Sequence, residues 1–259
     1  MEARATVQGR RLRLRLHPTE VFVPNLMSWL SAAHMRVRRG DAFLDVGTGS
    51  GLHAILAVLL GARRSYGTDI NPVALALARA NARLNGVSRV CRFLQGSLVE
   101  PLASRGLRVD AIVYNAPHFP GRLVAAGTPD RLARSVDGGA AGGDLNARFL
   151  REAPKVLAEG GRIYNPVVAW SDPETGARAA AEVGYGRAVL ARANIPVWGR
   201  GNHTRDWLME RPGRHSFAFA FRPRPDGAAR IEELTLAARR GPRPPRLDSR
   251  VVVDFRADR

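Results

Sequence analysis

From residue 42 onward, short apolar segments alternate with longer segments whose apolar residues recur at helical spacing. This alternation is typical of repeated β-α-β units, which form a parallel sheet with helices on its faces. A last apolar segment, 216–221, alternates phenylalanine with other residues and is expected to be an antiparallel strand. The sequence therefore predicts an α/β fold with a seven-stranded, mostly parallel sheet. The other expected strands are 42–46, 65–68, 90–95, 110–114, 162–168 and 186–194, and the helices are 51–60, 72–85, 144–157 and 173–183.

The segment before the sheet is expected to be an arm followed by a helix. In residues 1–20, leucines alternate with arginines at period two, which predicts one short strand. Residues 24–36 carry apolar side chains on one helical face, and Pro24 suits the first turn of a helix. We expect this arm and helix to contribute to the substrate and cofactor cleft.

Two further segments are rich in glycine, proline or arginine. The first, 116–143, is long enough to be a functional lid or a disordered loop, and a short helix is expected inside it. The second, 223–259, is expected to contain one helix near 231–239 and a β-like segment at 251–255. The chain is therefore divided into an N-terminal arm and helix (1–40), the sheet domain (41–222) and a basic extension (223–259).

A formal net charge of +17 is the unusual feature of the composition. Nearly all of it is arginine, since Lys155 is the only lysine. Two interpretations stay open: codon usage in a GC-rich genome, or attraction to an anionic partner such as RNA or the ribosome. The densest basic segments are the N-terminal arm and residues 239–246.

Other features of the composition exclude several classes of protein. Cys91 is the only cysteine, so an intramolecular disulfide and a Cys-based zinc cluster are excluded, and no metal site is expected. No run approaches the roughly 18 apolar residues of a membrane-spanning helix. No apolar segment follows the N-terminal arginines, so a secretory signal is not expected. These observations predict a cytoplasmic protein.

A glycine-rich turn, residues 45–51 (Asp-Val-Gly-Thr-Gly-Ser-Gly), directly follows the first strand of the predicted sheet and opens a helix. Ligands that carry a nucleoside bind at this position in such sheets. Glycines allow a tight turn and a close approach of the ligand to the backbone. The residues expected to bind the ligand here are Asp45, Gly47, Thr48, Gly49 and Gly51.

The pattern G-x-G-x-x-A at residues 49–54 also resembles a dinucleotide-binding turn. Asp45 argues against a dinucleotide, because a carboxylate at the strand tip would repel a pyrophosphate. S-adenosyl-L-methionine (SAM) lacks phosphates and offers an ammonium and a sulfonium group to that acid. We therefore expect SAM as the cofactor.

Two positions at the next strand tips extend this pocket. Asp69 follows the glycines by about twenty residues, the spacing at which an acid binds a ribose in this topology. Its alternative role, a helix N-cap, is already suited to Asn71. Ser97 lies at the end of the third strand, where an adenine-contacting turn is expected, although an ordinary turn fits equally well.

The motif Asn115-Ala116-Pro117-His118 follows the fourth strand, beside the glycine-rich turn at the topological switch point. The side-chain oxygen of Asn115 can accept a hydrogen bond from an NH2 group. The following proline fixes the chain so that backbone carbonyls can accept as well. Such a site would hold a nitrogen with its lone pair facing a methyl donor, although an ordinary Asn-Pro turn is the alternative. Asn115, Pro117 and His118 are the candidate catalytic residues, and Asn115 is also expected to contact the cofactor.

Together, the glycine-rich turn, Asp69 and the Asn-x-Pro motif resemble the Asn-Pro-Pro-Tyr group of class I, Rossmann-like, SAM-dependent methyltransferases. Within that group the chain is most similar to the release-factor glutamine N5-methyltransferases and to related RNA N-methyltransferases. Segments 21–24 and 135–161 also resemble the regions that flank the motifs in that group. The resemblance covers roughly residues 20–168 and implies a methyltransferase sheet with an antiparallel last strand.

The chain departs from the pattern of that group in three places. Ala116 stands where the group has a proline, and His118 stands where it has an aromatic residue. Phe119 could supply the stacking face one residue later. The short arm has no counterpart of the helical domain that binds release factors.

The resemblance implies transfer of a methyl group to a nitrogen of a protein side chain, an RNA base or a small metabolite. Two alternatives stay open: a methyltransferase of natural-product biosynthesis, and a non-catalytic RNA- or ribosome-binding module that keeps the fold.

Overall fold

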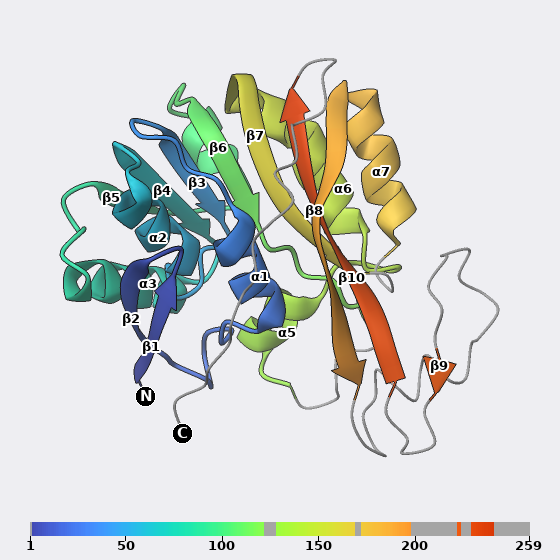
Figure 1. Cartoon of the computed structure of the whole chain (residues 1–259), viewed down its shortest axis with the longest axis horizontal. Coiled ribbons are helices and arrows are strands. Elements are labelled where there is room, and N and C mark those ends of the chain that lie inside the picture. Colours follow the sequence, from blue (N-terminus) through green and yellow to red (C-terminus); the bar gives the residue numbers. More distant parts are fainter. Residues whose placement is uncertain (1, 122–127, 169–171, 198–221, 224–228, 241–259) are drawn as a thin grey trace.

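The computed structural model describes residues 2–121, 128–168, 172–197, 222–223 and 229–240. Its central sheet has the strand order β5-β4-β3-β6-β7-β10-β8, and β9 pairs with β10 (Figure 1). Strands β3 to β7 are all parallel to one another. Strand β10 is antiparallel to both β7 and β8. The strands are β3 (Ala42–Val46), β4 (Arg64–Asp69), β5 (Cys91–Gln95), β6 (Val109–Tyr114), β7 (Leu157–Val168), β8 (Tyr185–Val197), β9 (Arg222–Pro223) and β10 (Ala229–Arg240).

The expected α/β fold with a mostly parallel sheet is confirmed. The antiparallel strand is β10, at 229–240, whereas the expected strand at 216–221 lies outside the described residues. The predicted helix near 231–239 is wrong, because this segment is part of β10. Its composition allows a helix, but pairing with strands on both edges overrides a weak local propensity. The β-like segment expected at 251–255 also lies outside the described residues.

Helices cover both faces of the sheet because alternate strand residues point to opposite sides. Phe43 packs with α1, α2 and α3 in one apolar cluster, and Leu44 packs with α4, α6 and α7 in another. No helix in the described part of the chain is long and apolar enough to cross a membrane. The helices are α1 (Leu26–His34), α2 (Leu52–Leu60), α3 (Pro72–Leu84), α4 (Glu100–Ala103), α5 (Asp130–Val136), α6 (Asp144–Glu152), the 3-10 turn η2 (Ala153–Lys155) and α7 (Pro173–Glu182).

The N-terminal arm is a hairpin of two strands, β1 (Glu2–Val7) and β2 (Arg10–Arg15), where the sequence predicts one. Gln8 and Gly9 both have positive φ, 49° and 73°, which is the geometry of a two-residue hairpin turn. The hairpin adds its buried leucines to the cluster around α2 and α3. It therefore belongs to the core of the protein.

Asn81 of α3 and Asn85, which caps the end of that helix, hold the free edge of β2. The Asn85 amide donates to the Arg13 carbonyl (2.7 Å) and accepts from the Arg13 N–H (3.0 Å). Asn81 makes the same pair of bonds with Arg15, and it also donates to the Ser50 carbonyl (2.8 Å). One buried side chain thus connects the hairpin to the glycine-rich turn.

The helix expected to run from 144 to 157 and to end at the glycine pair 160–161 is shorter. It ends at Glu152, because Pro154 lacks the N–H that would continue the α-helical bonding, and the chain tightens into η2. Strand β7 begins at Leu157, so both glycines lie inside a strand. The lid segment contains the short helix that was expected, α5.

Candidate active site

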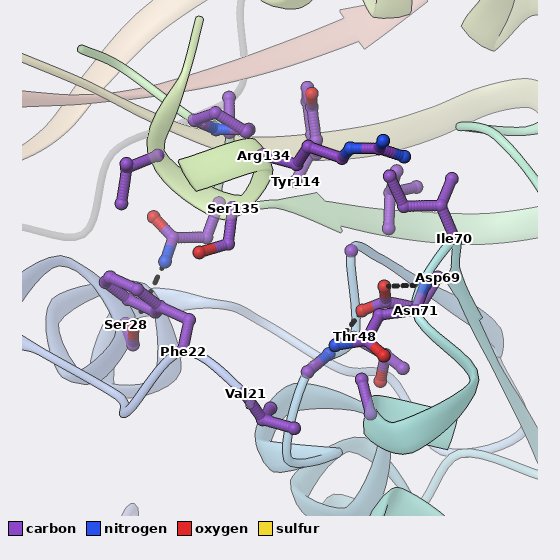
Figure 2. A pocket seen from close by; sticks show the side chains of 18 of the residues that line it. Val21, Phe22, Ser28, Thr48, Asp69, Ile70, Asn71, Tyr114, Arg134 and Ser135 are labelled. Carbon is purple, nitrogen blue, oxygen red and sulfur yellow. Dashed lines mark hydrogen bonds between the residues drawn. The ribbon is translucent and has the colours of Figure 1, made fainter. Parts of the chain in front are cut away.

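A pocket opens at the carboxyl ends of β3, β4 and β6, between α1 on one side and α5 on the other (Figure 2). This is the edge at which parallel sheets bind their ligands. The sequence-predicted residues that line it are Gly47, Thr48, Gly49, Asp69, Ser97, Asn115, Pro117 and His118. Asp45 and Gly51 do not line it, and the structure gives each of them other partners.

The glycine-rich turn lies close to β4 because Gly67 has no side chain. A Cβ atom added at Gly67 would lie 2.7 Å from Thr48 Oγ1 and 2.7 Å from the Phe93 ring. The Thr48 N–H donates to the Thr68 carbonyl at 2.9 Å, which fixes the turn against the strand. Gly47 faces open space, since an added Cβ would meet nothing within 4 Å. Its backbone is therefore accessible to a ligand.

Asp45 is 1% exposed and bonds to the turn from behind. Its carboxylate accepts from Thr48 Oγ1 at 2.7 Å and from the Ala54 N–H at 3.2 Å, and it lies 3.4 Å from His53 Nδ1. Gly51 has φ +85°, and an added Cβ would lie 3.1 Å from Cβ of Ala78 on α3. Both residues hold the turn in place, and their direct contact with a cofactor stays a prediction.

Asp69 places a carboxylate in the pocket (Figure 2). One oxygen accepts from the Gly49 N–H at 3.0 Å, and the other accepts from the Asn71 N–H at 2.9 Å. Each oxygen keeps lone pairs for a further donor, such as a hydroxyl. Burial raises the pKa of Asp69, backbone hydrogen bonds lower it, and the nearby charge of Asp45 raises it further.

Two apolar residues beside Asp69 were missed by the sequence reasoning. Ile70 is 50% exposed and lines the pocket, although a large apolar side chain in that position is usually buried. Leu98 also lines it and has φ +48°, a strained conformation for a residue with a side chain. The position of Ile70, directly after an acid at a strand tip, was the available signal. Together with Ser97 they make this end of the pocket suited to a flat apolar group.

Asn115 follows β6 and has a fixed orientation. Its Nδ2 donates to Ser28 Oγ of α1 at 3.0 Å, whereas its Oδ1 is buried and has no hydrogen-bond partner among the described residues. Leaving a buried amide oxygen without a hydrogen-bond partner costs free energy in a folded protein. Because Asn115 lines the pocket, this oxygen is available to a donor on a bound molecule. Ser28 was not identified from the sequence, because only the fold brings α1 next to β6.

The segment 117–119 is held by the glycines that follow α5. The Phe119 N–H donates to the Val136 carbonyl and the Gly138 N–H donates to the Phe119 carbonyl, both at 2.8 Å. A Cβ atom on Gly138 would lie 2.7 Å from the Pro117 carbonyl oxygen, so only glycine allows this approach. The described parts of the predicted lid are thus ordered against the Asn115 motif.

Known proteins resemble this chain in sequence and in fold. The model of the ribosomal protein L11 methyltransferase family (PrmA) matches residues 23–116. A Methanocaldococcus jannaschii protein assigned as a protein N5-glutamine methyltransferase is 33% identical over 152 residues, which are 59% of this chain and 74% of that protein. The chain belongs to the class I SAM-dependent methyltransferases. The cofactor of this methyltransferase is accordingly SAM.

Other relatives share smaller parts of the methyltransferase. The release factor glutamine methyltransferase of Moorella thermoacetica is 42% identical over 125 residues, which are 46% of this chain and 43% of that enzyme. The chain thus spans less than half the length of that relative. A methyltransferase from Pyrococcus furiosus has a TM-score of 0.53 at 15% identity, with 89% of each chain covered, and it supports the fold alone.

The residues of the pocket fit SAM. A dinucleotide would place its pyrophosphate against this turn, behind which the buried carboxylate of Asp45 lies, whereas SAM carries no phosphate and its ammonium and sulfonium are attracted by negative charge. Asp69 offers acceptors for ribose hydroxyls, and the apolar surface of Ile70 and Leu98 suits an adenine ring. The accessible backbone of Gly47 completes the cradle.

Burial lowers the pKa of His118 from its ordinary value of 6.5 to about 4, so the ring is neutral at neutral pH. The unfolded chain takes up this proton near pH 6.5 and the folded chain only near pH 4. Between these values the unfolded state binds more protons, and acidification destabilises the fold. We expect wild type to lose about 1–2 kcal/mol more stability than His118→Gln between pH 7 and pH 4, a figure reduced for the pocket's access to solvent.

Urea unfolding at several pH values measures this difference. The same substitution at the exposed His17, His17→Gln, is the matched control for the removal of a histidine. Equal pH dependence for wild type and His118→Gln would show that His118 is not held neutral in the folded state.

Proposed function

We propose that this methyltransferase transfers the methyl group of SAM to an NH2 nitrogen that Asn115 holds. The observation that carries the proposal is the buried, unpartnered Oδ1 of Asn115 in the pocket. Ser28 occupies the amide's donor side, so the oxygen is the side presented to the acceptor. A carbonyl oxygen accepts a hydrogen bond from an N–H group, so it can orient an NH2 nitrogen, whereas a carbon acceptor offers it no donor.

The remaining chemistry needs alignment more than activation. SAM supplies, when bound, a methyl group on a positively charged sulfur. Asn115 would orient the acceptor nitrogen so that its lone pair forms the new bond to the methyl carbon while the carbon–sulfur bond breaks. The sulfur would keep the electron pair and leave as a neutral thioether in S-adenosylhomocysteine, and the nitrogen would then release one proton. His118 contributes a neutral ring whose Nε2 is buried without a partner, so it can exchange a hydrogen bond with the acceptor or take up that proton. Pro117 fixes the backbone between these two side chains.

The cofactor is proposed to be held by the residues around the glycine-rich turn. Asp69 would accept from the ribose hydroxyls, and Ser97 would contact the adenine. The N-terminal segment 20–28 contributes residues to the pocket, which supports the division into an arm and helix beside the cleft (1–40) and a catalytic sheet domain (41–222). The cradle itself consists of Gly47, Thr48 and Gly49, held from behind by Asp45 and Gly51.

We propose a protein side-chain nitrogen as the acceptor, and a glutamine amide in particular. Two relatives are named for methylation of glutamine, one for release factors. A primary amide offers the NH2 donor that Asn115 Oδ1 lacks, and its planar group suits the aromatic surface of Phe22 and Phe119 in the pocket. A small metabolite with an amide or amine is the alternative, since this pocket would hold it by the same contacts.

Mass spectrometry of candidate acceptors after incubation with isotopically labelled SAM tests the proposal. The candidates are release factors, ribosomal protein L11, total RNA and a set of amides and amines. A label on nitrogen in a protein supports the proposal, and a label on nitrogen in a small molecule supports the alternative. A label on oxygen or carbon would contradict the role given to Asn115.

We further propose that the hairpin attracts RNA. Arg10, Arg11 and Arg15 are exposed there, and no acidic partner is found for them in the described part of the chain. If they contact phosphates, RNA affinity should fall steeply with salt, because each contact releases counterions. The double variant Arg11→Glu/Arg15→Glu should reduce the slope of log K against log salt by about two, whereas Arg178→Glu on α7 should leave it unchanged. Filter binding at several salt concentrations measures the slope. Equal slopes for all variants would show that these arginines do not contact RNA phosphates, and would leave codon usage as the explanation of the positive charge.

A further inference from the structure

His53 is the only polar residue of α2, and it is 5% exposed. Every other residue of that helix is apolar, so packing alone would favour an apolar side chain here as well. Burying an imidazole without partners costs free energy. The ring has two partners, and they lie on different segments of the chain.

One ring nitrogen faces α1 and the other faces the glycine-rich turn. His53 Nε2 lies 3.0 Å from the carbonyl oxygen of Ser28, and Nδ1 lies 3.4 Å from Asp45 Oδ1. A carbonyl oxygen only accepts, so Nε2 carries a proton in this contact. The ring therefore bridges α1 and the end of β3. It lies 3.0 Å from a backbone oxygen of the first and 3.4 Å from a carboxylate oxygen of the second.

Ser28 continues this bridge to the acceptor side of the pocket. Its carbonyl accepts from His53, and its hydroxyl accepts from Asn115 Nδ2 at 3.0 Å. The bond to Asn115 is the one that leaves Oδ1 free to face an acceptor. A shift of α1 relative to the turn would therefore move the Asn115 amide relative to the cofactor cradle.

We propose that His53 is a positioning residue, which sets the distance between the cofactor cradle and the acceptor-binding oxygen of Asn115. The bridge runs from Asp45 through His53 and Ser28 to Asn115. Its three consecutive contacts pass through α2 and α1 and join the cofactor side of the pocket to the acceptor side. Its effect on turnover rests on the proposed function of Asn115, whereas its effect on the geometry of Asn115 does not.

Two substitutions separate the two contacts of the ring. In His53→Gln, the amide nitrogen can take the place of Nε2 and keep the bond to Ser28. In His53→Asn, the shorter side chain can reach Asp45 but not the Ser28 carbonyl. Both variants replace the ring by an amide of smaller volume. If His53 only fills space, both should lower stability through poorer packing, and neither should move the Asn115 amide selectively.

The first readout is the pair of side-chain NH2 signals of Asn115 in nitrogen–proton NMR spectra, assigned by their loss in Asn115→Ala. We expect these signals to shift in His53→Asn and in Ser28→Ala, and to stay near their wild-type positions in His53→Gln and in the control His17→Gln. Unchanged signals in His53→Asn, or equal shifts in both His53 variants, would overturn the proposal. Ser28→Ala removes the hydroxyl but keeps the carbonyl that His53 contacts, so it calibrates the shift produced when the Asn115 bond is lost. If His53→Asn does not fold, His53→Leu, which suits the apolar helix α2 and has no hydrogen-bonding group, takes its place and is expected to shift the same signals.

The second readout separates binding from turnover. His53→Asn should lower kcat by about tenfold or more, because a small misplacement of the nucleophile is costly, with little change in the affinity for S-adenosylhomocysteine in calorimetry. His53→Gln should restore most of kcat. If the NMR shifts occur and kcat is unchanged in Asn115→Ala, the bridge exists but the proposed role of Asn115 fails. If Asn115→Ala is inactive and His53→Asn is fully active, the inference about His53 fails.

Discussion

Replacing Asn115 by alanine is expected to lower turnover about 100-fold or more and to leave SAM affinity nearly unchanged. The substitution removes the oxygen that faces the acceptor, whereas the cofactor side of the pocket keeps its turn and its acid. Methyl transfer needs a lone pair in line with the methyl group, so loss of alignment affects kcat directly. Initial rates with labelled SAM, together with calorimetry for cofactor binding, measure the two effects separately.

Asn115→Asp gives a sharper version of this test. It keeps the shape and the acceptor oxygen but removes the donor to Ser28 Oγ and adds a charge. Partial activity is expected, because an oxygen still faces the acceptor. Wild-type turnover in Asn115→Ala would show that the acceptor binds elsewhere.

Replacing Asp69 by alanine should weaken SAM binding by about 1–3 kcal/mol, the usual cost of leaving buried donors without a charged acceptor. The donors include the backbone N–H groups of Gly49 and Asn71, which lie 3.0 and 2.9 Å from the carboxylate. The proposed ribose hydroxyls lose their acceptor as well. The loss therefore combines a looser glycine-rich turn with fewer contacts to the cofactor.

Calorimetry with SAM and S-adenosylhomocysteine measures this loss, and Asp69→Asn provides the matched variant because it keeps one oxygen at nearly the same volume. Asp69→Asn should lie between wild type and Asp69→Ala. Unchanged affinity in Asp69→Ala would contradict the assignment of this carboxylate to the ribose.

Local sequence signals were sufficient for the parts of the fold that are built from one β-α-β unit at a time. Strand β3 and the cap of α3 by Asn71 follow the prediction, because burial and capping depend on nearby residues. The first strand of the hairpin, β1, was missed because its alternation is weak, and β10 was misassigned because only its two neighbours make it a strand.

The candidate site divides in the same way. Asp69 and Asn115 stand at strand tips, so the topology alone brings them to one pocket. Asp45 was expected to face the ligand, but Thr48 and Ala54 occupy its carboxylate, which spacing along the sequence does not reveal. Ser28 was missed because its contact with Asn115 spans 87 residues and depends on the packing of α1.

Asn81 and Asn85, at the end of α3, have a further consequence for the N-terminal hairpin. An exposed strand edge can pair with a strand of another chain and so promote aggregation. Strand β2 pairs with β1 on one side, and on the other the amides of Asn81 and Asn85 already occupy the backbone groups of Arg13 and Arg15. Side chains of a neighbouring helix thus take the place of an additional strand, and they keep this arginine-rich edge from recruiting one.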